Sequence, residues 1–337
     1  MKDTIKKLVE AYGPSGYEDQ VRALIREEIE GLADEIRVDA LGNLIARKGT
    51  GGDAGLAIML SAHMDEIGVM VAHIDEKGFA RFTSIGGVYP HTLIGNRVRF
   101  ANDTVGTIHI DEGLRGWRGK ALDINKMYID TGATSRETAS IKVGDAAAFL
   151  RSMDQVGDRL IAKSMDDRIS CAVLIETMRQ LETTPHTLYF VFSVQEEVGL
   201  VGARTSAYGI DPDLGIAVDV TLTGDTPEAI PMAVALGQGP AIKVMDGGML
   251  AHPAVKDLMV KRAEAAQIPY QLEILRGGTT DAYAIQVVRA GVPSGCLSIP
   301  TRHVHTPSEM VDLNDVQNAV KLLLEILSQP IDLGLEP

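Results

Sequence analysis

Two histidines and three carboxylates of this chain have side chains of the types that bind metal ions, and they follow short apolar segments. They are His63 in SAHMDEIG, Asp166 in KSMDDRIS, Glu197 in VFSVQEEVG, Asp219 in IAVDVT and His305 in TRHVHTP. The segments before four of them, LAIML, TLYFVF, LGIAV and GCLSI, are typical of parallel strands covered on both faces. Ligands of open α/β sheets bind beyond the carboxyl ends of the strands. We therefore expect the five side chains to converge there and to hold two divalent cations, which is a site for hydrolysis.

Each of these residues also has an ordinary structural explanation. A lone histidine after a strand is usually structural, and an aspartate such as Asp166 at the start of a helix usually caps it. Asp65 favours the metal site, because a ligand histidine such as His63 commonly donates its second ring N–H to a carboxylate; the alternative for Asp65 is a turn cap. Asp219 is the most informative residue, since an acid inside an apolar run needs a compensating charge. A metal ion is favoured there over a buried salt bridge.

Glu196 and Glu197 follow the apolar TLYFVF segment. Adjacent acids at the end of a buried strand are costly unless metal ions or hydrogen bonds compensate, and the alternative is a solvated loop tip. One glutamate of such a pair could bind a metal ion while the other serves as a general base. His303 and His305 lie on one face if their segment is extended, and the residues alone do not choose between them.

The helices and strands that must position these residues come before and after a segment with a different sequence pattern. Apolar residues at helical spacing predict helices over residues 4–12, 18–32, 168–181, 203–208, 253–267, 282–289 and 314–327. Residues 68–158 instead contain short alternating runs separated by turn residues, which is typical of a small all-β barrel or sandwich. We predict an α/β catalytic domain, residues 1–67 and 159–337, interrupted by a β-barrel domain, residues 68–158. Exposed strand edges on the insert would favour self-association.

Composition limits the partners and the location of the protein. The chain has 337 residues, of which 45% are hydrophobic, as in a globular protein. A formal net charge of −14 argues against binding to nucleic acid, which requires clustered Lys and Arg. The sequence shows no apolar stretch of the kind found in signal peptides or membrane spans, so we expect a cytoplasmic protein without membrane contact.

The motifs HMDEIG, MDDR, QEEVGLVGA, VDVT and HTP, in this combination, resemble those of the TET and glutamyl aminopeptidase family of dinuclear-zinc metallopeptidases. The resemblance covers essentially the whole chain, including the β insert. It implies a mixed-sheet α/β/α domain of the phosphorylase/hydrolase-like type and removal of N-terminal residues from short peptides. It also implies dimers formed through the insert and tetrahedral dodecamers built from them.

The resemblance assigns the metal ligands residue by residue. It implies that Asp166 bridges two divalent ions, zinc foremost, with cobalt or manganese as alternatives. We expect His63 and Asp219 on one ion and Glu197 and His305 on the other.

The catalytic roles come from the same resemblance. Glu196 matches the general base of the family, and Asp65 matches the acid that orients the ligand histidine. The peptide bond between Asp166 and Asp167 is expected to be cis, as in similar enzymes.

The sequence also offers two alternative functions. Members of this family have carried an endoglucanase label, but a glycosidase usually has aromatic residues along its cleft. Only 4% of this chain is aromatic, with one tryptophan, Trp117. A non-catalytic assembly stabilised by metals is disfavoured, because structural sites are usually closed Cys/His tetrahedra. The preferred N-terminal residue stays open, although Arg276 or Lys243 could favour acidic ones.

Overall fold

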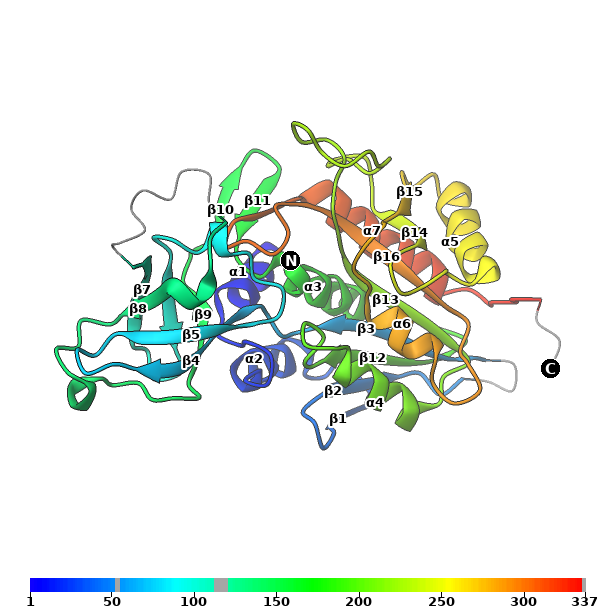
Figure 1. Cartoon of the computed structure of the whole chain (residues 1–337). Coiled ribbons are helices and arrows are strands. Elements are labelled where there is room, and N and C mark those ends of the chain that lie inside the picture. The colour runs from blue at the N-terminus through cyan, green and yellow to red at the C-terminus, as the bar shows by residue number, and fades with distance from the viewer. Residues whose placement is uncertain (52–54, 112–120, 335–337) are drawn as a thin grey trace.

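The computed structural model describes residues 1–51, 55–111 and 121–334, and contains a large sheet and a separate barrel (Figure 1). Trp117 lies outside the described residues. Along the sheet the strand order is β1 (Glu35–Val38), β2 (Leu44–Lys48), β12 (Thr187–Ser193), β3 (Ala57–His63), β13 (Leu214–Thr221), β16 (Ser294–Arg302), β17 (Glu309–Asp312), β11 (Arg159–Ala162) and β10 (Asp154–Val156). Two further strands, β14 (Ala241–Met245) and β15 (Gln271–Ile274), pair beside β16.

The central strands β12, β3, β13 and β16 are parallel neighbours, as predicted for the segments that precede the candidate ligands. Successive side chains of a strand point to opposite faces. Ile58 and Leu60 of β3 accordingly join the main core, whereas Met59 joins a second core on the other face. The carboxyl ends of these strands lie at one edge of the sheet, which is where the candidate ligands begin.

Helices cover both faces of the sheet. One layer contains α1 (Lys2–Glu10), α2 (Asp19–Ile29), α3 (Met165–Gln180), α5 (Pro253–Ala265) and α7 (Leu313–Leu327), and the other contains α4 (Val201–Ile210) and α6 (Asp281–Gln286). Every predicted helical segment corresponds to one of these helices. The mixed-sheet α/β/α prediction is confirmed.

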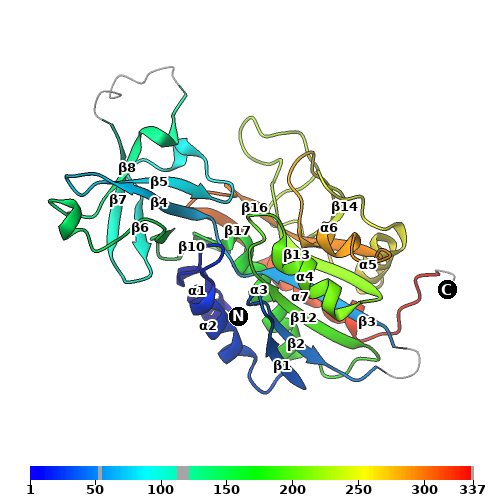
Figure 2. The ribbon, with the colours of Figure 1, turned by 60° about the horizontal axis from the view of Figure 1, so that its bottom comes forward.

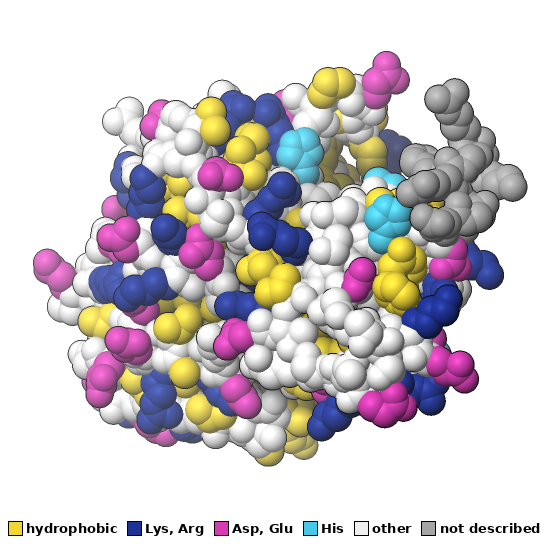
Figure 3. All heavy atoms as spheres, turned by 90° about the vertical axis from the view of Figure 1, so that its left-hand side faces the viewer, with side chains coloured by type: hydrophobic (Ala, Val, Ile, Leu, Met, Phe, Trp, Pro, Cys, Tyr) yellow, Lys and Arg dark blue, Asp and Glu magenta, His cyan; other side chains and the backbone are white. Residues whose placement is uncertain are grey.

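Between β3 and β10 the chain forms a closed barrel with its own hydrophobic core. Its strands are β4 (Gly68–Ile74), β5 (Ala80–Ile85), β6 (Arg97–Phe100), β7 (Val105–Ile110), β8 (Met127–Asp130) and β9 (Ala146–Phe149). The barrel lies to one side of the large sheet, next to α1 (Figures 1 and 2). Its outer end carries intermingled acidic and basic side chains with small hydrophobic patches (Figure 3).

One expectation about the insert was wrong. We expected exposed strand edges that could pair with another subunit, but the six strands close on themselves in the order β4-β5-β8-β7-β6-β9. Closure pairs the strand edges within the barrel. Any contact between subunits through this barrel therefore has to use side chains or loops. Among the helices in the described ranges, none is long and apolar enough to cross a membrane.

Candidate metal centre

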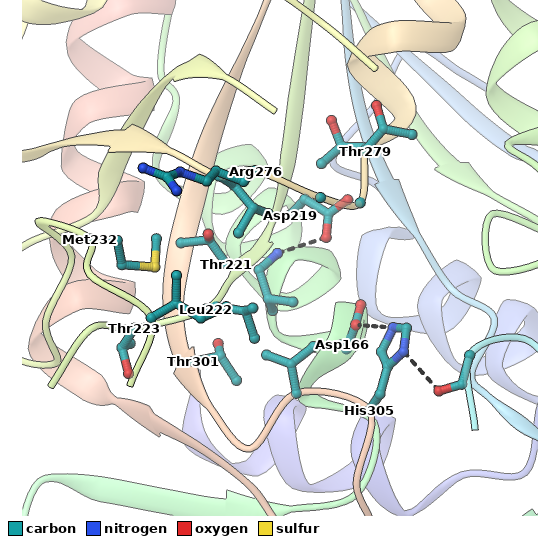
Figure 4. Close-up of a pocket in the computed structure, with 18 of the residues that line it drawn as sticks. Asp166, Asp219, Thr221, Leu222, Thr223, Met232, Arg276, Thr279, Thr301 and His305 are labelled. Carbon is teal, nitrogen blue, oxygen red and sulfur yellow. Dashed lines mark hydrogen bonds and ion pairs between the residues drawn. The ribbon is translucent and has the colours of Figure 1, made fainter. Parts of the chain in front are cut away.

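All five predicted ligands line one cavity of about 760 Å³ at the carboxyl ends of the central strands. Three of them, Asp166, Asp219 and His305, are labelled in Figure 4. His63 is the last residue of β3, and Asp219 lies near the end of β13. Glu197 and His305 lie in the loops after β12 and β16, and Asp166 comes from the start of α3. The structure thus brings together side chains that are spread over most of the sequence.

Asp166 lies between the two histidines. Its Oδ1 is 3.0 Å from Nε2 of His63, and its Oδ2 is 3.3 Å from Nε2 of His305. The same Nε2 of His305 is 3.5 Å from Oε2 of Glu197. Each oxygen of Asp166 therefore faces a different histidine, which suits a carboxylate that bridges two ions.

Asp167 also approaches the centre, although it was not among the predicted ligands. Donor atoms of His63, Asp167 and Asp219 all lie within 4.8 Å of one another. The Asp166–Asp167 peptide is cis, as the resemblance implied, and neither residue has helical dihedral angles. Oδ2 of Asp167 accepts the backbone N–H of His63 at 3.2 Å, while Oδ1 has no hydrogen-bond partner in the described part of the chain.

The carboxylates of this centre are buried close to one another. Burial and the charge of Asp166 raise the pKa of Glu197 to about 7, and burial raises the pKa of Asp219 well above its usual range. Burial by itself would lower the pKa of His305, but Asp166 and Glu197 raise it to about 10. Oε1 of Glu197 is buried without a hydrogen-bond partner within the described residues. Such an excess of buried negative charge, with histidines beside it, fits divalent cations.

Asp65 holds the loop that carries the adjacent glutamates. Its carboxylate accepts the backbone N–H groups of Glu196 and Glu197 at 3.0 and 3.2 Å, and the hydroxyl of Ser15 at 2.6 Å. Nδ1 of His63 lies 3.2 Å from the carbonyl oxygen of Asp65 and 3.4 Å from its carboxylate. Asp65 thus contacts a candidate ligand and the glutamate loop together.

Two further glutamates support the centre and were missed from the sequence. Glu18 accepts the backbone N–H of Gln195 at 3.2 Å. Glu309 accepts the backbone N–H groups of Asp166 and His305 at 3.0 and 2.8 Å. Glu18 lies 177 positions from Gln195, and Glu309 lies 143 from Asp166, so no local motif signals either contact.

The structure distinguishes the two histidines of TRHVHTP. Both line the cavity, but it is His305 whose Nε2 faces Asp166 and Glu197. Its Nδ1 is 2.9 Å from the carbonyl oxygen of Gly87, which belongs to the barrel loop after β5. For His303, no ion pair with a carboxylate is found among the described residues.

A cluster of carboxylates and histidines beyond the ends of parallel strands could hold metal ions of the kind that support hydrolysis. The chain belongs to the M42 glutamyl aminopeptidase family, whose model matches residues 42–322. A relative in Acetivibrio thermocellus, provisionally named an aminopeptidase, is 50% identical over 97% of this chain and 98% of that protein. Lysyl aminopeptidase of Pyrococcus furiosus is 37% identical over 98% of each chain.

Solved structures agree with this assignment. The TET aminopeptidase of a marine-sediment thaumarchaeon has a TM-score of 0.93 and 35% identity, covering 97% of this chain and 96% of that one. The TET1 peptidase of Pyrococcus horikoshii, which can assemble into a tetrahedron or a large octahedral shell, has a TM-score of 0.86 and 31% identity over 97% and 98% of the two chains. A structure from Thermotoga maritima named an endoglucanase has a TM-score of 0.81 and 33% identity over 96% of each chain. The chain is thus an aminopeptidase by family.

Proposed function

We propose that this aminopeptidase is a dinuclear metalloenzyme that removes residues one at a time from the amino terminus of short peptides. The observation that carries the proposal is the Asp166 carboxylate, whose two oxygens face His63 and His305 at 3.0 and 3.3 Å. We assign His63 and Asp219 to one ion and Glu197 and His305 to the other, with Asp166 bridging. Zinc fits these donors, and so do cobalt and manganese.

Bound ions of this kind supply Lewis acidity, which polarises the scissile carbonyl and acidifies an attacking water. Glu196 lines the cavity with Oε2 3.9 Å from Nε2 of His63, and we assign it the role of general base. Burial raises the pKa of Glu196 well above its usual range, opposed by His63 and reinforced by Asp219 and Glu197. Its place in the cavity beside the ligand His63 suits Glu196 to accept a proton from water and to return it to the leaving amine.

The buried carboxylates also suit a substrate with a free α-amino group. Two ions would neutralise the ligand carboxylates, but the other carboxylates of the centre, such as Glu196 and Asp167, would still attract an ammonium group, whereas an acetylated terminus has no charge to pair with them. This difference supports cleavage from the amino terminus.

A direct test uses leucine p-nitroanilide and its N-acetylated form. Dialysis against a strong chelator should abolish hydrolysis, zinc or cobalt(II) should restore it, and the acetylated form should be refractory. Full activity in protein without bound transition metal would contradict the metal mechanism. Comparable hydrolysis of the acetylated substrate would contradict the exopeptidase mechanism.

The wall of the cavity away from His305 suggests which first residue is preferred. Leu222, Met232 and Arg276 lie across the cavity from His305 (Figure 4). The apolar side chains suit an apolar residue of medium size. Arg276 adds a positive charge at the same wall.

The other two basic side chains of the cavity are neutralised. Nζ of Lys243 is 2.6 Å from Glu273, and Nη2 of Arg302 is 2.7 Å from Asp225. For Arg276, no ion-pair partner is found in the described part of the chain. We therefore propose that apolar or acidic N-terminal residues are preferred over lysine, unlike the preference named for the Pyrococcus furiosus relative.

The proposal includes assembly and location. By analogy with the tetrahedral and octahedral shells of the TET1 peptidase, we propose that residues 68–158 form a domain through which a cytoplasmic homo-oligomer, a tetrahedral dodecamer, is built. A closed shell would restrict access to short peptides.

An endoglucanase activity is the second candidate, because a related structure carries that name. Among the described residues that line the cavity, Tyr89 is the one Phe, Tyr or Trp, whereas sugar clefts usually stack several aromatic rings on the substrate. Release of reducing sugar from carboxymethyl cellulose by the metal-loaded enzyme would support this alternative against the peptidase.

A further inference from the structure

The barrel reaches the metal centre through two glycines, Gly86 and Gly87, in the loop between β5 and the short 3-10 helix η1 (Pro90–Thr92). The carbonyl oxygen of Gly87 is 2.9 Å from Nδ1 of His305, as the dashed line in Figure 4 shows. Gly86 lies against Glu197, since a Cβ at Gly86 would be 3.0 Å from Oε2 of that side chain. One loop of the barrel therefore backs both His305 and Glu197.

The hydrogen bond to the Gly87 carbonyl determines which imidazole nitrogen of His305 is available to a metal ion. An acceptor at Nδ1 holds the proton on that nitrogen, which leaves Nε2 unprotonated in the neutral ring. It is this Nε2 that lies 3.3 Å from Asp166 and 3.5 Å from Glu197. The backbone of His305 is held separately, by Glu309 at 2.8 Å, so Gly87 is the partner that orients the ring.

Gly87 has no room for a side chain. A Cβ there would lie 2.4 Å from Nδ1 and 2.6 Å from Cε1 of His305. Gly86 has a φ of +72°, which by itself favours glycine, whereas Gly87 has no positive φ. The backbone of Gly87 would therefore accept another residue, and it is the ring of His305 that excludes one.

We propose that Gly87 is a positioning residue for the metal ion bound by Glu197 and His305, so that the barrel completes the catalytic centre. This inference rests on the proposed function, because it requires His305 to be a ligand. Loss of such an outer contact typically lowers metal affinity or activity about 10- to 100-fold.

The test is the substitution Gly87→Ala, with metal content as the readout. Metal-free protein is titrated with cobalt(II) chloride, and bound cobalt is measured by elemental analysis and visible absorption. We expect the wild type to bind two ions per subunit, and Gly87→Ala to bind one of them at least about 10-fold more weakly. The control is Gly209→Ala in α4, where a Cβ meets open space and φ is not positive, so binding should be unchanged.

A double substitution separates positioning from a role in folding. In a His305→Ala background the ring that a Cβ would strike is absent, so adding Gly87→Ala should change neither cobalt binding nor the melting temperature further. The inference would be overturned if Gly87→Ala bound two ions with wild-type affinity. It would also be overturned if Gly87→Ala lowered the melting temperature equally in the wild type and in the His305→Ala variant. A wild type that binds no ions would instead refute the proposed function.

Discussion

At the scale of single residues, the centre places two adjacent glutamates in different surroundings. Oε2 of Glu197 is 3.5 Å from His305, on the side of Asp166 that faces this histidine. Oε2 of Glu196 is 3.9 Å from His63 and lines the open cavity. The hydrogen bonds of both backbone N–H groups to Asp65 fix the loop so that neighbours in sequence can have separate tasks.

Substituting each glutamate tests this division. Glu196→Gln keeps the shape but removes the base, so metal content should persist while kcat falls about 100-fold or more. Glu197→Gln should instead weaken metal binding, because an amide is a poorer ligand than a carboxylate. Elemental analysis and steady-state kinetics on both variants check the prediction. The reverse pair of phenotypes would show that the roles are exchanged.

Arg276 allows a second test at this scale. Arg276→Ala should lower kcat/KM for a glutamyl substrate relative to a leucyl one by about 2- to 5-fold, the effect of a partly solvated charge contact. Arg276→Glu should raise the relative rate for a lysyl substrate. The matched control is Arg37→Ala, at an exposed position on β1. Unchanged ratios in both Arg276 variants would exclude this side chain from specificity.

The sequence revealed those site residues whose type conflicts with their local surroundings. Asp219 is a carboxylate in an apolar strand, and Glu196 and Glu197 closely follow another, so each needed a compensating partner. Glu18 and Glu309 follow no such rule, because they are polar residues in ordinary positions that acquire a role only through distant contacts. Sequence patterns do not encode those pairings.

At the scale of elements, periodicity predicted the helices and the four parallel strands well, because each is buried on defined faces. The start of α3 departs from periodicity, since Asp166 and Asp167 lack helical dihedral angles. The β-barrel predicted for the insert is confirmed, but its strand order β4-β5-β8-β7-β6-β9 could not be read from the sequence, since strand order depends on pairing between distant segments.

Arg302 lines the cavity, and its ion pair with Asp225 gives a prediction for pH. Arg302, at the end of β16, donates to both carboxylate oxygens of Asp225, in the loop after β13, at 3.0 and 2.7 Å. Its hydrogen bonds hold the pKa of Asp225 well below its usual range. The pair therefore stabilises the fold above the unfolded pKa of 3.8, and this contribution is lost as pH falls toward the folded pKa.

Asp225→Asn should accordingly destabilise the protein by up to about 1 kcal/mol at pH 7, because solvent screens the pair, and by less at pH 3. Thermal unfolding of both proteins across this pH range measures the difference. Asp257→Asn is the control, because its partner Lys256 is a neighbour on the surface of α5. A difference between Asp225→Asn and the wild type that does not shrink on acidification would contradict the ion-pair explanation.

At the scale of the whole molecule, the barrel has two separable roles under our proposals. Its loop at Gly86 and Gly87 faces the metal centre, whereas its outer surface is available to other subunits. Deleting residues 68–158 would therefore remove both at once, and loss of activity in such a deletion would not identify the cause. Substitutions on the outer surface keep the loop intact.

We predict that the intact protein is a homo-oligomer and that changes on the barrel surface reduce its subunit number. Val105 and Val143 are 44% and 61% exposed, so glutamate at these positions adds charge without disturbing the barrel core. Val105→Glu combined with Val143→Glu should lower the mass measured by multi-angle light scattering while two metal ions per subunit are retained. Val38→Glu, on the exposed strand β1 of the large sheet, is the control and should leave the mass unchanged. An intact protein that is monomeric at micromolar concentration would contradict assembly altogether. If the barrel substitutions left the oligomer intact and Val38→Glu disrupted it, the contact between subunits would lie on the α/β domain instead.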